Sequence, residues 1–288
     1  MTHSPLASPS ATIAVLERHG LRTRKSLGQH FLVDDNVIGR ILGLARLGPG
    51  DAVLEVGPGI GTLTAALAGA AGSVVAVERD AGLLPVLAET LAGSVNVRVV
   101  HADAVEVAVA ELCSDAGPPT AFVANLPYGV AATVVLRFFE EIASLASATV
   151  MVQAEVADRM SAAPGGKDYG AYTVKLRLLA EPAGRFAVPR SCFLPPPRVD
   201  SAVLRLDRAR RPESPDVLRD AATAADAAFA QRRKTLRNSL SAALAAPVSQ
   251  VERTLARAGI DPGRRAETVG VDEYLSLGAA LREHGLLP

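Results

Sequence analysis

Three closely spaced glycines end an apolar run near position 55. The stretch reads Val53-Leu-Glu-Val-Gly-Pro-Gly-Ile-Gly-Thr62, with glycine at positions 57, 59 and 61. Glycine lets the backbone turn sharply and approach a ligand closely, and the start of a following helix offers free N–H groups. We therefore expect a nucleotide-binding turn. A dinucleotide-binding fingerprint would have its third glycine where Thr62 stands, which argues against NAD.

Carboxylates follow the next two apolar runs. Glu78 ends the run that begins at Val74, and Asp103 follows the run that begins at Val97. A carboxylate accepts hydrogen bonds, so Glu78 can bind both hydroxyls of a ribose and Asp103 can bind the exocyclic amine of an adenine. A ligand with ribose and adenine but without a pyrophosphate fits S-adenosylmethionine. The alternative is a tight turn with two surface carboxylates. All three features, however, fall at successive strand ends on the carboxyl edge of one sheet, where α/β proteins bind ligands.

A fourth feature, Asn125-Leu-Pro-Tyr128, follows another apolar run. The Asn125 amide oxygen and the Leu126 carbonyl, held by the rigid Pro127, can both accept hydrogen bonds from an exocyclic NH₂, while the Tyr128 ring lies against a base. The lone pair of an adenine amine is delocalised into the ring, and hydrogen bonds donated by its two N–H groups favour a pyramidal nitrogen that can attack a methyl sulfonium. We predict amine methylation without a metal ion and without a Ser, His or Cys nucleophile. Taken alone, the motif could also be an Asn-Pro turn with a core tyrosine.

The elements that must position these residues alternate between strands and helices. Short β-branched runs are separated by Ala- and Leu-rich segments, which is the α/β pattern. The runs are almost wholly apolar, as strands buried on both faces of a mainly parallel sheet should be. After Val174, two apolar stretches around a Pro-rich loop predict a hairpin that closes the sheet edge. The predicted strands cover residues 53–56, 74–77, 97–100, 122–124, 149–152, 184–188 and 201–206.

The chain of 288 residues is long enough for two domains. Segment 207–216 is charged, contains two prolines and is almost free of apolar residues, which is typical of a linker. We therefore expect a first domain over residues 1–207 and a small all-helical domain over 208–288, with a helix break at Pro247. Two more helices are expected at 11–19 and 37–47, on either side of a loop.

Composition excludes several classes of protein. Hydrophobic residues make up 49% of the chain and charged residues 21%, and no apolar stretch reaches the roughly 18 residues of a membrane span. The first ten residues lack the basic and apolar regions of a secretory signal, so we expect the protein in the cytoplasm. Cys113 and Cys192 cannot form a disulfide framework or a zinc site, and we expect both to be buried.

The formal net charge is zero, which argues against nucleic-acid binding through bulk charge. The charge is unevenly distributed, at −3 for residues 1–207 and +3 for residues 208–288. A nucleic-acid-binding surface would therefore have to be local. Two basic clusters are candidates: Arg22, Arg24 and Lys25 in a loop, and Arg232, Arg233, Lys234 and Arg237, which we place on a helix. Taken alone, either cluster could simply be a solvated face of the protein. If the active site modifies RNA, the clusters are better explained as contacts to the phosphates of that polyanionic substrate.

Across nearly its whole length the chain resembles the ribosomal RNA adenine N6-dimethyltransferases, and within them the type that modifies small-subunit (16S) RNA. The motifs that carry the resemblance stand in order along the chain. They are Lys25-Ser-Leu-Gly-Gln-His-Phe-Leu32, Glu55-Val-Gly-Pro-Gly-Ile-Gly61, Glu78, Asp103, Asn125-Leu-Pro-Tyr128, Val152-Gln-Ala-Glu-Val156, Lys167-Asp-Tyr-Gly170, Phe193-Leu-Pro-Pro-Pro-Arg-Val199 and Gln231-Arg-Arg-Lys-Thr-Leu-Arg-Asn238.

The resemblance implies a Rossmann-like, class I S-adenosylmethionine-dependent methyltransferase fold with a seven-stranded, mostly parallel sheet. It implies that Tyr128 and Phe193 sandwich a flipped base, as stacking and base extrusion demand. The cofactor residues expected from it are Gln29, His30, Leu32, Gly57, Gly59, Glu78, Asp103 and Asn125. The residues expected at the target base are Asn125, Leu126, Pro127, Tyr128 and Phe193. Two residues depart from the family pattern: His30 stands where Asn is common, and Ala154 stands where Lys is common. These departures concern only the cofactor loop and surface contacts with RNA.

By the same resemblance, S-adenosylmethionine supplies two methyl groups to each of two adjacent adenosines in the terminal hairpin of small-subunit ribosomal RNA. The expected partner is an immature small ribosomal subunit, and we expect a monomer without membrane association. The large-subunit adenine dimethyltransferases that confer macrolide resistance share the sheet motifs, but Leu126 and segment 231–238 resemble the small-subunit type. A non-catalytic assembly or transcription factor that keeps the fold as a nucleic-acid clamp is a second alternative, which the intact Asn125 to Tyr128 motif disfavours.

Overall fold

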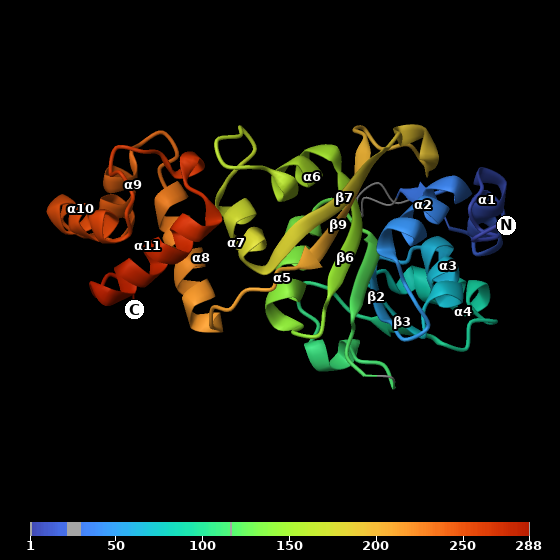
Figure 1. The fold of residues 1–288 in the computed structure, drawn as a ribbon. Coiled ribbons are helices and arrows are strands. Elements are labelled where there is room, and N and C mark those ends of the chain that lie inside the picture. Colours follow the sequence, from blue (N-terminus) through green and yellow to red (C-terminus); the bar gives the residue numbers. More distant parts are fainter. Residues whose placement is uncertain (1, 22–29, 116, 288) are drawn as a thin grey trace. The chain divides into compact units, whose positions relative to one another are not determined.

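The computed structural model describes residues 2–21, 30–115 and 117–287. The chain forms two compact units, and Figure 1 follows it through both by colour. Unit 1 consists of Met1–Ala157 and Pro182–Arg208, and unit 2 of Asp158–Glu181 and Ala209–Pro288. The expected boundary after residue 207 lies beside the observed one after residue 208. Segment 158–181 differs from the expectation, because it packs with the C-terminal helices.

Unit 1 is built on a seven-stranded sheet. Its strands are β2 (Ala52–Val56), β3 (Ser73–Glu78), β4 (Val97–His101), β5 (Ala121–Asn125), β6 (Ser147–Gln153), β7 (Ala180–Val188) and β9 (Ser201–Arg208). Their order is β4-β3-β2-β5-β6-β9-β7. The pairs from β4 to β6 are parallel, and β9 runs antiparallel to β6. The predicted α/β class and mostly parallel sheet are confirmed, and the two late strands lie at one edge as expected.

Helices cover both faces of this sheet, because its strands are apolar on both sides. On one face, α2 (Asp35–Ala45) and α3 (Thr62–Ala70) share a core cluster with Val53, Val74 and Val123. On the other face lies α5 (Ala131–Glu141), whose Phe138 ring meets Phe122 edge to face with centroids 5.1 Å apart. Neighbouring strand residues point to opposite faces, so Phe122 and Val123 assign these helices to different sides. A further helix, α4 (Leu84–Thr90), packs against β4.

The N-terminal segment is held by caps and by a second, two-stranded sheet. Helix α1 (Pro9–Arg18) begins after Ser8, whose hydroxyl accepts a hydrogen bond from the Ala11 N–H at 3.2 Å. Strand β1 (Phe31–Leu32) pairs antiparallel with β8 (Phe193–Leu194). The helices predicted at 11–19 and 37–47 are confirmed, with each beginning two residues earlier. The pairing of β1 with β8 brings the early chain beside the Pro-rich loop.

Unit 2 is helical and has its own core. Its helices after α6 (Ala154–Ser161), which begins in unit 1, are α7 (Ala171–Leu179), α8 (Pro215–Phe229), α9 (Leu236–Ala243), α10 (Val248–Arg257) and α11 (Val271–Glu283). A Cβ on Gly278 would lie 2.6 Å from the Ala221 nitrogen, so glycine is required where α11 crosses α8. The Arg282 Nε atom donates to Asp220 Oδ2 at 2.9 Å across the same pair of helices.

Several smaller expectations can be compared with this fold. No described residue of 217–287 lies in a strand, and the segment is mainly helical, as predicted. The expected linker is shortened because β9 reaches Arg208 and α8 begins at Pro215. Cys192 is buried, but Cys113 is only partly buried, so that part of the prediction was wrong. Within the described ranges, no helix combines the length and apolar character that crossing a membrane requires.

Candidate active site

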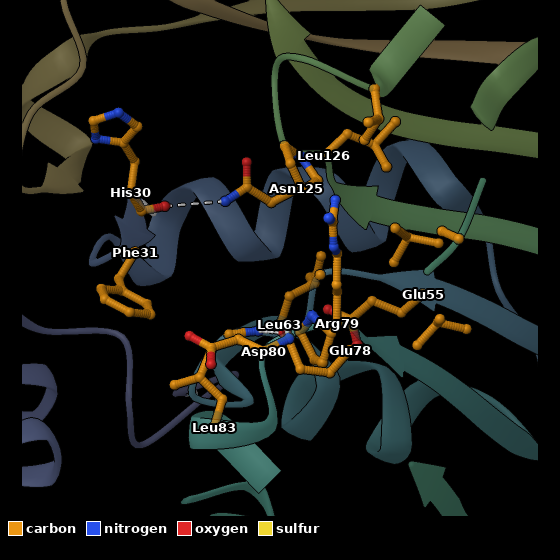
Figure 2. Close-up of a pocket in the computed structure, with 18 of the residues that line it drawn as sticks. His30, Phe31, Glu55, Leu63, Glu78, Arg79, Asp80, Leu83, Asn125 and Leu126 are labelled. Carbon is orange, nitrogen blue, oxygen red and sulfur yellow. Dashed lines mark hydrogen bonds between the residues drawn. The ribbon is translucent and has the colours of Figure 1, made fainter. Parts of the chain in front are cut away.

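A cavity of about 670 Å³ opens in unit 1 at the carboxyl ends of the parallel strands. Residues that follow β2, β3, β4 and β5 all contribute to its wall, and Figure 2 shows several of them facing one another. Of the residues predicted for cofactor and target base, those that line it are His30, Leu32, Gly57, Gly59, Glu78, Asp103, Asn125, Leu126, Pro127 and Tyr128. Four strand ends thus bring residues from distant parts of the sequence to one site.

The glycine turn after β2 forms one wall and requires glycine for two reasons. Gly57, Gly59 and Gly61 have φ angles of 72°, 61° and 86°, in the left-handed region that side chains disfavour. A Cβ on Gly57 would also come within 3.3 Å of the Pro127 ring, and a Cβ on Gly59 within 3.2 Å of the Phe31 ring. The turn therefore lets the backbone lie close to both the Pro127 loop and β1.

Glu78 is held at the end of β3 by backbone donors. Its Oε1 atom accepts a hydrogen bond from the Asp80 N–H at 2.7 Å, and its Oε2 atom accepts from the Gly59 N–H at 3.4 Å. The side chain is buried, and this burial raises the pKa of the Glu78 carboxyl although the backbone donors oppose the shift. The carboxyl group is fixed between the glycine turn and the cavity.

Asp103 lies after β4 with its two carboxyl oxygens in different surroundings. Oδ1 accepts a hydrogen bond from the Val105 N–H at 2.9 Å. Oδ2 lies 3.2 Å from Arg79 Nη1 and forms an ion pair with it. Arg79 lines the cavity and was not predicted from the sequence. Its position directly after a strand-ending carboxylate is the only sequence signal that could have indicated it.

Asn125 has one defined orientation at the end of β5. Its Nδ2 group donates to the His30 carbonyl oxygen at 3.3 Å (Figure 2). A carbonyl can only accept, so the amide nitrogen must face His30 and Oδ1 remains as an acceptor. In the described part of the chain, no group donates a hydrogen bond to Asn125 Oδ1 or to the Leu126 carbonyl oxygen. The site therefore offers two neighbouring acceptors.

Tyr128 is fixed by contacts at both ends of its side chain. Its hydroxyl and the Ser201 hydroxyl share a hydrogen bond at 2.9 Å, and its ring stacks on His30 with centroids 5.9 Å apart and planes at 27°. Burial raises the pKa of the Tyr128 hydroxyl. His30 is held in turn by the Pro195 carbonyl oxygen, 2.8 Å from its Nδ1 atom. The aromatic ring therefore has a set position in the cavity wall.

Glu55 is a cavity residue that the sequence analysis quoted only as part of a motif. It is 1% exposed, and its Oε2 atom has no hydrogen-bond partner among the described residues. Burial raises the pKa of this carboxyl from 4.5 to about 8. The signal for it was available, because a carboxylate stands in the otherwise apolar strand β2.

One described residue that was predicted at the target base, Phe193, is not brought to the cavity. Phe193 is 2% exposed and packs in the core of unit 1, and it is not among the residues of the cavity wall. Gln29, Arg22, Arg24 and Lys25 lie outside the described residues. Among the described residues, no three His, Cys, Asp or Glu side chains gather into a group that could hold a metal ion.

The basic cluster of unit 2 is a turn, and the prediction of a helix there was wrong. Helix α8 ends at Phe229 and α9 begins at Leu236, so that only Arg237 of the cluster is helical. The Leu236 N–H donates to the Arg264 carbonyl at 2.8 Å and the Arg237 N–H to the Pro262 carbonyl at 3.3 Å. These tertiary bonds, together with repulsion between adjacent cations, favour a turn over a continuous helix.

The three arginines of this cluster that were predicted to bind RNA differ in their contacts. Arg232 donates to the carbonyl oxygens of Lys167 at 2.5 Å and Tyr169 at 3.3 Å. Arg237 forms an ion pair with Glu252 at 3.1 Å. Arg233 is exposed and has no hydrogen bond or ion pair with any described residue. Arg233 is therefore the arginine of this cluster whose charge is fully available.

Comparison with known proteins identifies the family. The family described as Ribosomal RNA adenine dimethylase matches residues 20–282. The chain belongs to this family. It is therefore an rRNA adenine dimethylase by family and a methyltransferase by class.

Relatives of this dimethylase match it over nearly full length. Ribosomal RNA small subunit methyltransferase A of Pelotomaculum thermopropionicum is 44% identical to it over 97% of this chain and 98% of that protein. The protein of the same name from Geobacillus kaustophilus is 42% identical over 97% of this chain and 98% of that protein.

Solved structures share the fold of this dimethylase. A dimethyladenosine transferase from Plasmodium falciparum has a TM-score of 0.75 at 22% identity, over 89% of this chain and 98% of its own. The 23S rRNA methyltransferase ErmE has a TM-score of 0.64 at 32% identity, over 88% of this chain and 99% of its own. The expected Rossmann-like methyltransferase fold is confirmed.

Proposed function

We propose that this dimethylase transfers methyl groups from S-adenosylmethionine to the N6 amines of two adjacent adenosines in the 3′-terminal hairpin of small-subunit (16S) ribosomal RNA, as a step of ribosome biogenesis. The observation that carries the proposal is the pair of open acceptors at Asn125 and Leu126, in the same cavity wall as Glu78 and Asp103. The names of the full-length relatives support the choice of small-subunit RNA.

The chemistry of the cavity residues fits the cofactor. Glu78 and Asp103 offer carboxyl oxygens for ribose hydroxyls and an adenine amine, and the glycines at 57 and 59 leave room for close approach. His30 and Leu32 would border the methionine part, together with Gln29. Bound S-adenosylmethionine supplies an electrophilic methyl group on a sulfonium, and no group on the protein has to act as a nucleophile.

The residues after β5 act on the target amine. The Asn125 Oδ1 atom and the Leu126 carbonyl would accept hydrogen bonds from its two N–H groups, which localises the lone pair on nitrogen and directs it toward the methyl group. The N–CH₃ bond would form as the S–CH₃ bond breaks, and the methylated amine would then lose one N–H proton to solvent. Pro127 fixes the Leu126 carbonyl, and the Tyr128 ring supplies a surface on which the extruded base can stack. The Asn125 Oδ1 atom is available as an acceptor in this position, because the amide nitrogen is the atom that donates to the His30 carbonyl.

RNA docking is assigned to the two basic clusters. Arg233 offers an unpaired guanidinium, Arg232 and Arg237 flank it, and Arg22, Arg24 and Lys25 supply a second set of charges in unit 1. Unit 2, which contains residues 209–288 of the expected second domain 208–288, would serve as the RNA-docking unit. The substrate would be an immature small subunit, to which the enzyme binds as a monomer.

A direct comparison of substrates tests the proposal. Undermethylated small and large ribosomal subunits are incubated in parallel with the enzyme and S-adenosylmethionine labelled in its methyl group. We expect label to enter RNA of the small subunit only. Preferential labelling of the large subunit would instead assign the enzyme to the activity named for ErmE, which is 32% identical to it. Binding of particles without any transfer would favour a non-catalytic clamp.

A further inference from the structure

Within the described part of the chain, Arg79 is the only arginine in the cavity wall. It follows Glu78 directly, and its side chain is 72% exposed. Figure 2 shows this side chain extended among the residues that line the cavity. The transfer chemistry proposed above gives this cation no task, so its ion pair with Asp103 requires another explanation.

The two oxygens of Asp103 show what the ion pair does. Oδ1 is bound to the Val105 N–H in the turn after β4, at 2.9 Å. Oδ2 is the oxygen left for a ligand, and it is the one that Arg79 Nη1 holds at 3.2 Å. An adenine amine and a guanidinium are both N–H donors, and both would approach this oxygen from inside the same cavity. The guanidinium therefore lies at the oxygen that the donor of the ligand would approach.

We propose that Arg79 is an internal competitor for the adenosyl subsite, which occupies Asp103 Oδ2 until an adenine amine displaces it. The proposal rests on the assignment of Asp103 under the proposed function. The exchange leaves Asp103 Oδ2 with a hydrogen-bond donor, and the exposed guanidinium returns to water. In reverse, Arg79 takes Oδ2 again as the adenine leaves, which speeds release of the spent cofactor.

Binding of S-adenosylhomocysteine tests this competition, because that ligand carries no net charge. Calorimetry would compare the wild type with Arg79→Met, which keeps the length of the side chain and removes its charge. We expect Arg79→Met to bind about two- to fivefold more tightly, the range for removal of an exposed ion pair, mainly through slower dissociation. High salt should shrink the difference, since salt screens the pair. Arg253→Met, an exposed arginine on α10, is the matched control and should change nothing.

Two further arms separate the possible failures. In an Asp103→Asn background the gain from Arg79→Met should largely disappear. Suppose that Asp103→Asn weakens ligand binding but that Arg79→Met leaves it unchanged or also weakens it. The role of Arg79 as a competitor is then overturned, while the assignment of Asp103 to the adenine amine stands. If Asp103→Asn binds as tightly as the wild type, the assignment of Asp103 and the competitor both fall.

The purine analogue of the ligand, which carries hydrogen at C6 in place of the amine, supplies the last arm. It has no N–H group at that edge, so it neither donates to Asp103 nor replaces Arg79 there. Arg79→Met should therefore leave binding of the purine ligand unchanged while it strengthens binding of the adenosyl ligand. An equal gain for both ligands would indicate a general effect of charge in the cavity and would contradict the competition.

Discussion

Under the proposed function, Asn125 is the residue on which methyl transfer would depend most directly. We expect Asn125→Ala to lower the transfer rate by about a hundredfold, since it removes an acceptor that matters most as charge develops on the amine. Binding of the small subunit should stay close to that of the wild type. Single-turnover transfer and particle binding, measured separately, check this. Equal losses of both would mean that Asn125 is needed for folding or docking instead.

Glu55 makes the stability of the protein depend on pH. Its pKa is about 8 in the folded protein against 4.5 in the reference state, so the folded form keeps a proton that the unfolded chain releases as pH rises between these values. The wild type should therefore lose stability from about pH 5 to about pH 8, at up to about 1.4 kcal/mol per pH unit.

Glu55→Gln removes this titration and should gain stability relative to the wild type as pH rises. Urea unfolding of the ligand-free protein across the same range measures it. Glu106→Gln, at an exposed position, is the control. If both variants have the same dependence of unfolding free energy on pH as the wild type, Glu55 is not the group responsible for it.

Phe193 has two possible roles that one substitution separates. Its burial and its place in β8 indicate a packing role, whereas the family resemblance implies stacking on the target base. Phe193→Leu keeps apolar bulk but removes the π-face, and such swaps cost less than about 1.5 kcal/mol where repacking is possible. We expect the Leu variant to fold and to transfer methyl groups at close to the wild-type rate. A large rate loss in a folded Leu variant would show that Phe193 leaves the core to stack on the base.

At the scale of elements, the turn between α8 and α9 is the segment whose RNA role can be measured most cleanly. Arg233→Gln removes a charge that no described residue pairs with. It should reduce the dependence of log affinity on log salt by about 0.7 to 0.9 for each phosphate that the variant no longer neutralises. Arg253→Gln on α10 is the control. A salt dependence that Arg233→Gln leaves unchanged would place the RNA surface elsewhere.

The buried strands of the sheet were predictable from the sequence. The tertiary arrangement of the residues around the cavity was only partly predictable. The apolar runs at 53–56 and 122–124 had to be buried strands, and parallel order then put Gly57 and Asn125 at one edge. The position of Phe193 was not predictable, because it depends on pairing of β8 with β1 across most of unit 1. The turn at 231–234 was mistaken for a helix because the carbonyls of Pro262 and Arg264, which hold it, are remote in sequence.

At the scale of the whole molecule, zero net charge shapes how the substrate is recognised. A neutral protein attracts a polyanion weakly at long range, so a few phosphate contacts must match an RNA shape that already exists. We therefore expect naked RNA to be a poor substrate. Initial rates on a synthetic hairpin and on immature small subunits, at equal RNA concentration, measure this. Equal rates would show that the hairpin alone carries the recognition.

The measurement that tests the central claim most directly is a map of the modified bases. Undermethylated small subunits are incubated with S-adenosylmethionine and either the wild type or Asn125→Ala, and the RNA is digested and analysed by mass spectrometry. We predict N6,N6-dimethyladenosine at two adjacent positions of the 3′-terminal hairpin with the wild type, and little or none in the same time with Asn125→Ala. Methyl groups at other positions, at another atom of adenine, or in equal amounts from the variant would contradict the proposed function.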